Sequence, residues 1–182
     1  MMYYIGAASR QLTGFALWKK SANNTTTGNM VLDENFKEFI ELLNENHVKY
    51  LVVGGYAVAY HGYPRYTKDI DFWIWADPEN ADRILKTIED FGLGSIGLQK
   101  DDLLNPDNVI QLGYEPNRID LIVQLEGLDF ITCYEQRQET SFENLPIPFI
   151  NLDHLIINKR STGRLKDKAD AKALEKKKNK KK

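Results

Sequence analysis

The chain has 182 residues, of which 42% are hydrophobic and 11% aromatic, as in an ordinary single-domain globular protein. Its one cysteine, Cys133, excludes an intramolecular disulfide and fits a reducing cytoplasm, and no apolar run approaches the ~18 residues of a membrane span or forms a signal peptide. The net charge of −2 conceals an asymmetry, because residues 175–182 carry +5 and leave −7 for the remainder.

Residues 1–29 differ from the rest of the chain. The polar run NNTTTGN (residues 23–29) leads to Met30, and periodic hydrophobic patterns begin only after it. We therefore expect residues 1–29 to be a poorly ordered leader, with Met30 as the functional start and a single domain over residues 30–174. The alternative is that the YYI or FALW segments (residues 3–5 and 15–18) dock onto this domain.

A helix is expected first, over residues 33–46. Its apolar side chains recur at helical spacing and form one face, and Asp33 stands where an N-cap is expected. These apolar residues are Phe36, Phe39, Ile40 and Leu43. We interpret His47, at the end of this helix, as a polar terminal residue rather than a catalytic base.

Residues 50–75 combine a buried strand, two glycines and a second strand. The apolar run 50–53 predicts a strand, Gly54-Gly55 a turn, residues 56–60 a short helix, and residues 61–64 another turn. Glycines in this place let the backbone approach a ligand closely, and N–H groups at a helix start favour an anion. Glycine pairs also occur in simple turns, so the pair alone is weak evidence.

Asp69 and Asp71 stand two residues apart in the second strand, about 6.6 Å from each other on one face. Two anions on one face repel each other unless a cation lies between them, and carboxylate oxygens suit Mg²⁺ or Mn²⁺. The alternative is a solvated strand with two surface aspartates. A phosphate-binding turn 15 residues before a metal-binding pair suggests a nucleoside triphosphate with its metal ions.

The middle of the chain predicts a helix and a hairpin. The helix starts at Asp77-Pro78 and closes near Gly92, and the acidic segment 98–106 is expected to be irregular. Residues 109–113 and 119–123 predict two antiparallel strands joined by a turn. Asp120 interrupts the second strand, either as a solvent-facing partner of Arg118 or as a third metal ligand.

The C-terminal third predicts mostly helices. Residues 128–138 suggest a short helix followed by a loop, and residues 145–150, with two prolines, an extended segment at a sheet edge. Helices are expected from residue 153 to 160 and from 169 to 174. The lysine-rich residues 175–182 are expected to be a disordered tail that adds at most salt-dependent affinity for nucleic acid.

The central motifs resemble those of nucleotidyltransferases of the DNA polymerase beta superfamily, and are most similar to its small bacterial branch of minimal nucleotidyltransferases and abortive-infection toxins. The motifs are Gly54-Gly55-Tyr56-Ala57, His61-Gly62 and Arg65-x-Thr67-x-Asp69-Ile70-Asp71, and the resemblance covers most of residues 32–174. It implies an α/β (α+β) fold, in which a small mixed β-sheet is flanked by helices and a C-terminal helical segment closes one side.

The resemblance also implies roles for individual residues. Two Mg²⁺ or Mn²⁺ ions would be held by the catalytic residues Asp69, Asp71 and Asp120. The NTP would be bound by Gly54, Gly55, Arg65, Thr67, Lys159 and Arg164, although Arg65 and Thr67 can equally order their loop. Lys159 and Arg164 can equally belong to a charged surface helix pair, which is our interpretation of Asp167 and Asp170. Many relatives carry Ser where this chain has Gly55, so a hydroxyl contact to phosphate is missing.

The expected function is metal-dependent transfer of a nucleoside monophosphate from an NTP to a hydroxyl of RNA, protein or a small molecule, with release of pyrophosphate. The lysine run and the resemblance favour tRNA or a partner protein as acceptor, and the resemblance suggests a toxin–antitoxin or defence system with a cognate antitoxin. The alternative is a catalytically silent nucleotide- or partner-binding module of the same fold. The presence of three carboxylates favours the enzyme over this module. An unrelated α/β protein with a fortuitous Asp-x-Asp pair is a further alternative.

Overall fold

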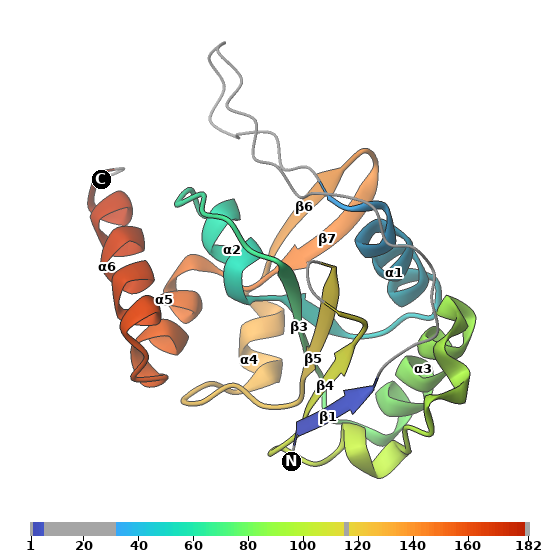
Figure 1. Cartoon of the computed structure of the whole chain (residues 1–182). Coiled ribbons are helices and arrows are strands. Elements are labelled where there is room, and N and C mark those ends of the chain that lie inside the picture. The colour runs from blue at the N-terminus through green and yellow to red at the C-terminus, as the bar shows by residue number, and fades with distance from the viewer. Residues whose placement is uncertain (1, 6–31, 115–116, 181–182) are drawn as a thin grey trace.

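The computed structural model describes residues 2–5, 32–114 and 117–180, and its centre is a seven-stranded mixed sheet in the order β1-β4-β5-β3-β2-β7-β6 (Figure 1). The strands are β1 (Met2–Ile5), β2 (Tyr50–Val52), β3 (Asp69–Ile74), β4 (Val109–Leu112), β5 (Arg118–Ile122), β6 (Gln138–Phe142) and β7 (Leu145–Phe149). The helices are α1 (Glu34–Glu45), α2 (Gly54–Tyr60), α3 (Pro78–Ile88), α4 (Phe130–Glu135), α5 (Leu152–Ser161) and α6 (Leu165–Lys180).

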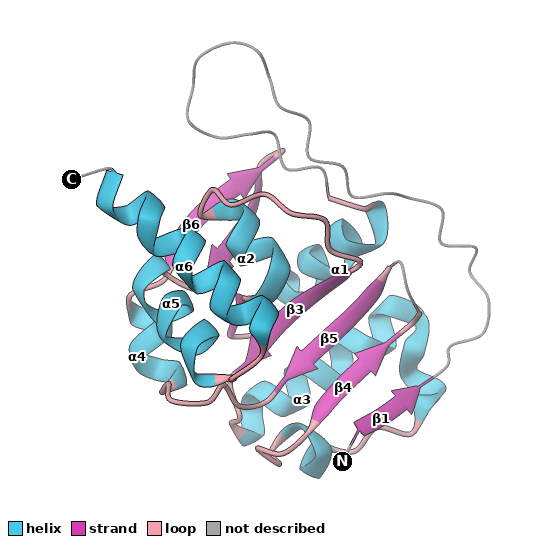
Figure 2. Cartoon of the chain, turned by 60° about the vertical axis from the view of Figure 1, so that its left-hand side comes forward, coloured by secondary structure: helices cyan, strands magenta, loops and turns pink. Residues whose placement is uncertain are grey.

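Helices α1 and α3 cover one face of the sheet, whereas α2, α5 and α6 gather on the other side, beside β3 (Figure 2). The alternation of β3 explains this division. Phe72 turns toward α1, where its ring lies 5.6 Å from that of Phe39 in the hydrophobic core. Asp69 and Asp71 therefore point to the opposite face, because side chains two residues apart share a face and neighbours do not.

The predicted starts of α1 and α3 and the predicted hairpin are confirmed. Asp33 accepts the Asn35 backbone N–H at the start of α1, and Asp77 accepts those of Glu79 and Asn80 at the start of α3. Strands β4 and β5 pair in antiparallel fashion, as expected. The π-helical and 3₁₀ turns at Glu89–Leu93, Gly94–Ile96 and Lys100–Leu103 follow α3.

The predicted edge position of residues 145–150 is wrong. Strand β6, for which the sequence predicted no element, forms the edge and pairs with β7 along its whole length. Pro146 and Pro148 fit the inner strand because β7 meets β2 at one residue pair only, Phe149 with Val52. The Ile150 N–H donates to the Val52 carbonyl at 3.1 Å, so the two proline nitrogens face the side of β7 where few donors are needed.

The described parts of the expected leader and tail, residues 2–5 and 175–180, form regular elements. Residues 2–5 form β1, parallel to β4, which corresponds to the alternative in which the YYI segment docks on the domain. The helix α6 continues to Lys180 instead of ending at residue 174. Lysine, alanine and leucine are strong helix formers, and Ala171 and Leu174 are buried against the domain. The proposed start at Met30 falls outside the described residues.

Candidate active site

The three predicted carboxylates meet on one face of two neighbouring strands. Strands β3 and β5 are parallel, and their register places Asp71 opposite Asp120 and Asp69 opposite Arg118. Strand β5, which follows much later in the sequence, thus places the third aspartate beside the Asp-x-Asp pair of β3. We call Asp69, Asp71 and Asp120 the carboxylate cluster.

Arg118 bridges two members of the carboxylate cluster. Its Nε and one terminal nitrogen donate to the two carboxylate oxygens of Asp120 at 2.7 and 2.8 Å, and the terminal nitrogen also donates to Asp69 at 2.9 Å. The pairing of Arg118 with Asp120 that the sequence raised as an alternative is therefore present, together with the proximity of the three carboxylates. The two interpretations are not exclusive.

The carboxylate cluster carries more negative charge than its surroundings neutralise. Burial, together with the charges of Asp69 and Asp120, raises the pKa of Asp71 to about 6, although Lys159 and the Gly55 backbone N–H act in the opposite direction. Burial also raises the pKa of Asp120, while Arg118 opposes this effect. Such a cluster favours a bound cation, because a positive charge between the carboxylates would relieve their repulsion.

The glycine pair makes room for the side chains of the site. Gly54 has a φ of +59°, and a Cβ on it would lie 1.8 Å from a carboxylate oxygen of Asp71. A Cβ on Gly55 would lie 2.5 Å from the Thr67 hydroxyl. Thr67 therefore places a hydroxyl beside Gly55, where many relatives carry the hydroxyl of a serine, and it donates a 2.7 Å hydrogen bond to Asp69.

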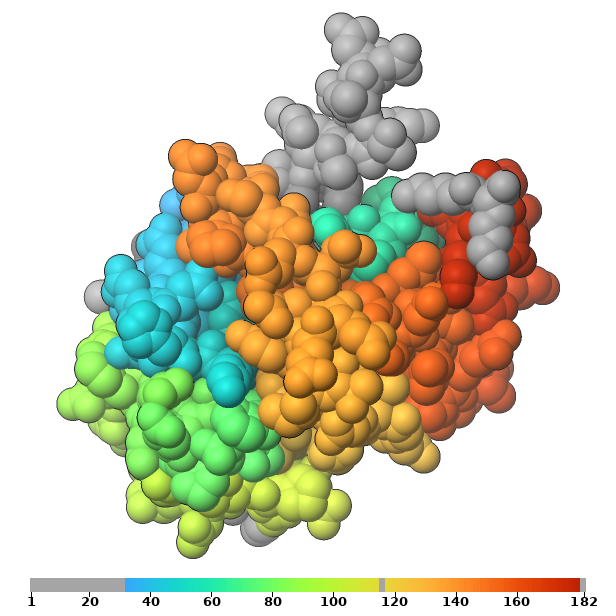
Figure 3. Space-filling model, turned by 180° about the vertical axis from the view of Figure 1, so that it is seen from behind, coloured from blue at the N-terminus to red at the C-terminus, as the bar shows by residue number. Residues whose placement is uncertain are grey.

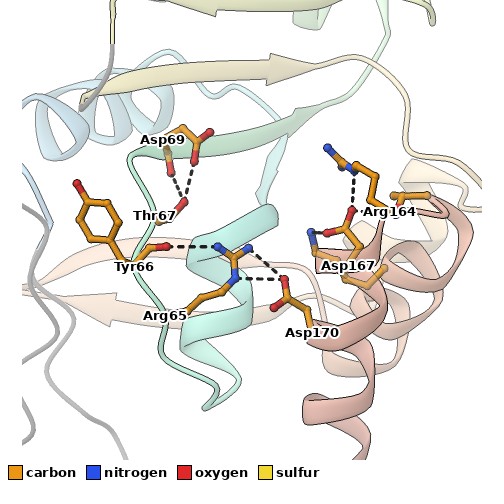
Figure 4. Close-up of polar contacts among 9 residues, drawn as sticks. Arg65, Tyr66, Thr67, Asp69, Arg164, Asp167 and Asp170 are labelled. Atoms are coloured by element: carbon orange, nitrogen blue, oxygen red, sulfur yellow. Dashed lines mark hydrogen bonds and ion pairs between the residues drawn. The ribbon is translucent and has the colours of Figure 1, made fainter.

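The loop before β3 is held from the helical side (Figure 4). Arg65 reaches toward α6, and its Nε and a terminal nitrogen each lie 3.1 Å from one oxygen of the buried Asp170. The Tyr66 ring points to the other side of the loop. Of the two roles expected for Arg65 and Thr67, the contacts seen here are those that order the loop.

A second group of charges joins α5 to α6. We call Lys159, Thr162, Arg164 and Asp167 the ion-pair cluster. Lys159 donates to Asp167 at 2.7 Å, with side chains only 6% and 5% exposed, and Thr162 and Arg164 donate to the other oxygen at 2.8 and 2.7 Å. The expectation of a charged surface pair is wrong for Asp167 and Asp170, which are buried. Arg164 remains 73% exposed and is thus accessible to a ligand.

Two further polar residues near the carboxylate cluster were missed by the sequence analysis. Gln111, on β4, lies opposite Asp120 and donates to it at 3.4 Å, while its buried side-chain carbonyl oxygen has no hydrogen-bond partner among the described residues. In the part of the chain that the structure describes, the buried Tyr56 hydroxyl also lacks a hydrogen-bond partner, and burial, with the charges of Asp33 and Asp69, raises its pKa. The sequence signal that could have identified Gln111 is the predicted hairpin, because the pairing of β4 with β5 places Gln111 opposite Asp120.

The donor chemistry of the cluster fits a divalent cation, although the side chains do not enclose one as they stand. Within the described ranges, no group of three or more His, Cys, Asp or Glu residues is arranged to hold a metal ion. Carboxylates with a raised pKa and the orphaned carbonyl of Gln111 are nevertheless oxygen ligands of the kind that Mg²⁺ and Mn²⁺ prefer. Binding would require Arg118 to release Asp69 and Asp120.

A hollow of about 490 Å³ lies at the other end of β3 and β5, away from the carboxylates. It is lined by Trp75, Ala76, Val123, Gln124, Gly127, Leu128, Asp129, Phe130 and Ile131. No member of the carboxylate cluster contributes to it, so we assign it no part in the chemistry.

Comparisons with known proteins place the chain in a nucleotidyltransferase family. The chain belongs to the family of nucleotidyltransferases of unknown function (DUF6036), whose model matches residues 30–177. The fold is similar to that of the lincosamide antibiotic adenylyltransferase LnuA in its lincomycin-bound crystal structure, with a TM-score of 0.52 and 18% identity over 81% of this chain and 98% of that one. No curated protein matches the sequence. The expected family, fold class and enzyme class are thus confirmed.

Within the described residues, no helix is long and apolar enough to cross a membrane.

Proposed function

We propose that the protein transfers a nucleoside monophosphate from an NTP to a hydroxyl group, with the carboxylate cluster as the site of a divalent metal. One observation carries the proposal: three aspartates on adjacent parallel strands share a face next to a Gly-Gly turn, where burial, together with the charges of Asp69 and Asp120, raises the pKa of Asp71 to about 6. A structural cluster would be expected to balance its charge, whereas a ligand-binding one leaves it for the ligand.

Asp69, Asp71 and Asp120 would hold two Mg²⁺ or Mn²⁺ ions. When bound, such ions lower the pKa of an attacking hydroxyl and neutralise charge on the triphosphate. Gly54 and Gly55 let the backbone approach the phosphates, and Thr67 keeps Asp69 in position through its 2.7 Å hydrogen bond.

In the proposed reaction the acceptor oxygen forms a bond to the α-phosphorus, and the bond between that phosphorus and the oxygen bridging to the β-phosphate breaks. Pyrophosphate leaves with the bonding electrons, and Asp120 accepts the hydroxyl proton. The exposed Arg164 would bind the triphosphate, whereas Lys159 would act through its charge from within the ion-pair cluster.

The cellular setting that we propose is a toxin–antitoxin or defence system in the cytoplasm, with a cognate antitoxin or another partner protein. The support for it is the resemblance of the Gly54–Asp71 motifs to those of the small bacterial branch. The acceptor would be an RNA, such as tRNA, a partner protein or a small molecule.

The test is the transfer of label from α-phosphate-labelled NTPs, one base at a time, to total tRNA, to cell protein and to small hydroxyl compounds. We expect label on one acceptor class in the presence of Mg²⁺ or Mn²⁺, and none with chelator. The Asp69→Asn/Asp71→Asn variant is the control, because it removes two of the three carboxylates and keeps the side-chain size. Transfer that survives in this variant would refute the proposed site, and metal-dependent NTP binding without transfer would indicate the silent module instead.

A further inference from the structure

The two sides of helix α6 carry charges of opposite sign. Its three acidic residues turn toward the domain, where Asp167 binds Lys159, Asp170 binds Arg65 and Glu175 pairs with Arg160. All three acidic side chains of the helix therefore form ion pairs with basic side chains of the same protein. The basic charge on the outer side has no such compensation.

The outer side of α6 carries a straight row of lysines. Lys168, Lys172, Lys176 and Lys180 are all exposed and follow one another at intervals of four residues, which places them on one face with a rise of about 6 Å from each to the next. Within residues 32–114 and 117–180, none of these four takes part in an ion pair. Figure 3 shows α6, in red, at the outer margin of the molecule beyond α5. We call these four residues the lysine row.

A regularly spaced line of cations is complementary to a polyanion with charges at short, regular intervals, such as a nucleic-acid backbone. An anionic membrane is the competing partner, but interfacial helices bind through a wide apolar face. In α6 the apolar residues Ala171 and Leu174 are buried against the domain, and the exposed Leu165 alone offers little apolar surface. The observations therefore favour nucleic acid.

The helix that carries the lysine row also contacts the loop before β3, the strand that carries Asp69 and Asp71. Asp170 holds Arg65, and Lys177 donates to the Gly62 carbonyl oxygen, so α6 contacts the loop at two points. This loop exposes Tyr63 and Tyr66, the second of them to 56%. Tyr66 directly precedes the Thr67 that hydrogen-bonds Asp69, and exposed aromatic rings are the platforms on which unpaired bases stack.

We propose that the lysine row binds the backbone of a single-stranded nucleic acid whose end is the acceptor, with Tyr66 stacking a base beside the carboxylate cluster. The assignment of the strand as acceptor rests on the proposed function, in which a terminal hydroxyl attacks the α-phosphorus and pyrophosphate leaves. The binding surface itself does not depend on that reaction.

Binding is measured by fluorescence anisotropy with labelled single-stranded RNA and DNA of mixed sequence, in chelator and without NTP, over about 50 to 200 mM salt. The test variant is Lys168→Gln/Lys172→Gln/Lys176→Gln/Lys180→Gln, which keeps helix propensity. Its affinity should fall about 10²-fold, and the slope of log K against log salt should become shallower by about 3, because about 0.7 counterions are released per phosphate contact on a single strand. RNA or DNA binding with this behaviour supports the proposal.

Three controls make the result decisive. The same four positions changed to arginine should keep the affinity, and Lys86→Gln/Lys100→Gln, on the α3 side, should lower it far less. Tyr66→Ala should weaken binding about 10-fold or more, whereas Tyr66→Phe keeps the ring and should not. Thermal unfolding of each variant checks that the domain is intact.

The proposal is overturned if the wild-type protein shows no salt-dependent affinity, if the glutamine variant binds as the wild type does, or if anionic vesicles bind the lysine row while both oligonucleotides do not. Label transfer to the bound oligonucleotide is then assayed separately. Binding without transfer to any acceptor counts against the proposed function but not against the surface, and transfer to protein only counts against the nucleic-acid acceptor.

Discussion

Lys159 belongs to the ion-pair cluster and also acts by its charge on the carboxylate cluster, yet the aspartates of the two clusters have pKa values shifted in opposite directions. Asp71 has a pKa raised to about 6 by burial and by Asp69 and Asp120, whereas the pKa of Asp167 is lowered. Burial alone would raise the pKa of Asp167 too, but hydrogen bonds from Lys159 and Thr162 outweigh it. Burial is thus common to both, and the balance of charge decides the direction.

The carboxylate cluster has the charge balance of a ligand site, whereas the ion-pair cluster has that of a structural contact. In the ion-pair cluster one carboxylate is surrounded by three donors, so its negative charge is satisfied within the protein. In the carboxylate cluster the Arg118 guanidinium contacts two of the three carboxylates, those of Asp69 and Asp120. Changes in the first should therefore reduce stability, and changes in the second should reduce activity with little loss of stability.

The largest effect is expected for Asp71→Asn. Nucleotidyl transfer should fall by about 10³-fold or more, since the loss of a metal-binding carboxylate removes several kcal/mol of charge stabilisation in the transition state. The free energy of unfolding should stay the same or rise, because a repelled charge is removed. Label transfer and urea unfolding measure the two quantities. If Asp71→Asn lowered both stability and activity, the carboxylate cluster would be a structural contact as the ion-pair cluster is.

Asp167→Asn should show the reverse pattern. Without the carboxylate, the Lys159 ammonium is left buried without its counter-charge, and the free energy of unfolding should fall by about 3 kcal/mol. Urea denaturation is the measurement. Asp167→Asn/Lys159→Met, which removes both charges, should recover much of the loss. If the single variant were as stable as the wild type, the ion-pair cluster would not be a structural contact.

The Gly55–Thr67 contact sharpens the comparison within the active site. Gly55→Ser should destabilise the protein by about 1–3 kcal/mol, because its Cβ would lie 2.5 Å from the Thr67 hydroxyl. Gly55→Ser/Thr67→Ala should recover part of the stability, because the hydroxyl is removed but the residue 67 Cβ, 2.8 Å from the added Cβ, remains. A double-mutant cycle on unfolding free energies measures the coupling. Additive effects of the two substitutions would show that the two side chains do not compete for one space.

The smallest effect concerns pH. Because the folded-state pKa of Asp167 lies below its unfolded value, the stability from this group is fully present above the unfolded pKa of about 3.9 and is lost as pH falls through the folded value. Between neutral pH and this acidic range, unfolding free energies of wild type and Asp167→Asn should converge on the acid side. A constant difference over the whole range would contradict the pKa assignment.

The helices and strands that local sequence patterns specify were predictable, and so was the position of the three aspartates on strands. The i, i+2 spacing of Asp69 and Asp71 placed them on one face, and the predicted hairpin set Asp120 on a strand of its own. Arg118 was identified as a partner of Asp120, but its contact with Asp69 depends on the parallel pairing of β3 with β5, which no local pattern encodes.

The remaining errors arise where tertiary contacts override local appearance. Strand β6 has an exposed, polar sequence that resembles a loop, and only β7 makes it a strand. Asp167 and Asp170 are as polar as any surface residue, and only the packing of α6 on α5 and on the Arg65 loop buries them. The lysine run was expected to be disordered because composition ignores the buried Leu174 that anchors it.

The anchoring of α6 has a practical consequence for anyone who shortens the chain. A C-terminus rich in lysine invites trimming, and removing only the last few residues leaves Asp167 and Asp170 in place. A cut ahead of Leu165 would leave the Lys159 ammonium and the Arg65 guanidinium without their carboxylates. The structural change would then affect the loop that carries Arg65 and Thr67, about a hundred residues earlier in the sequence, as well as the new C-terminus.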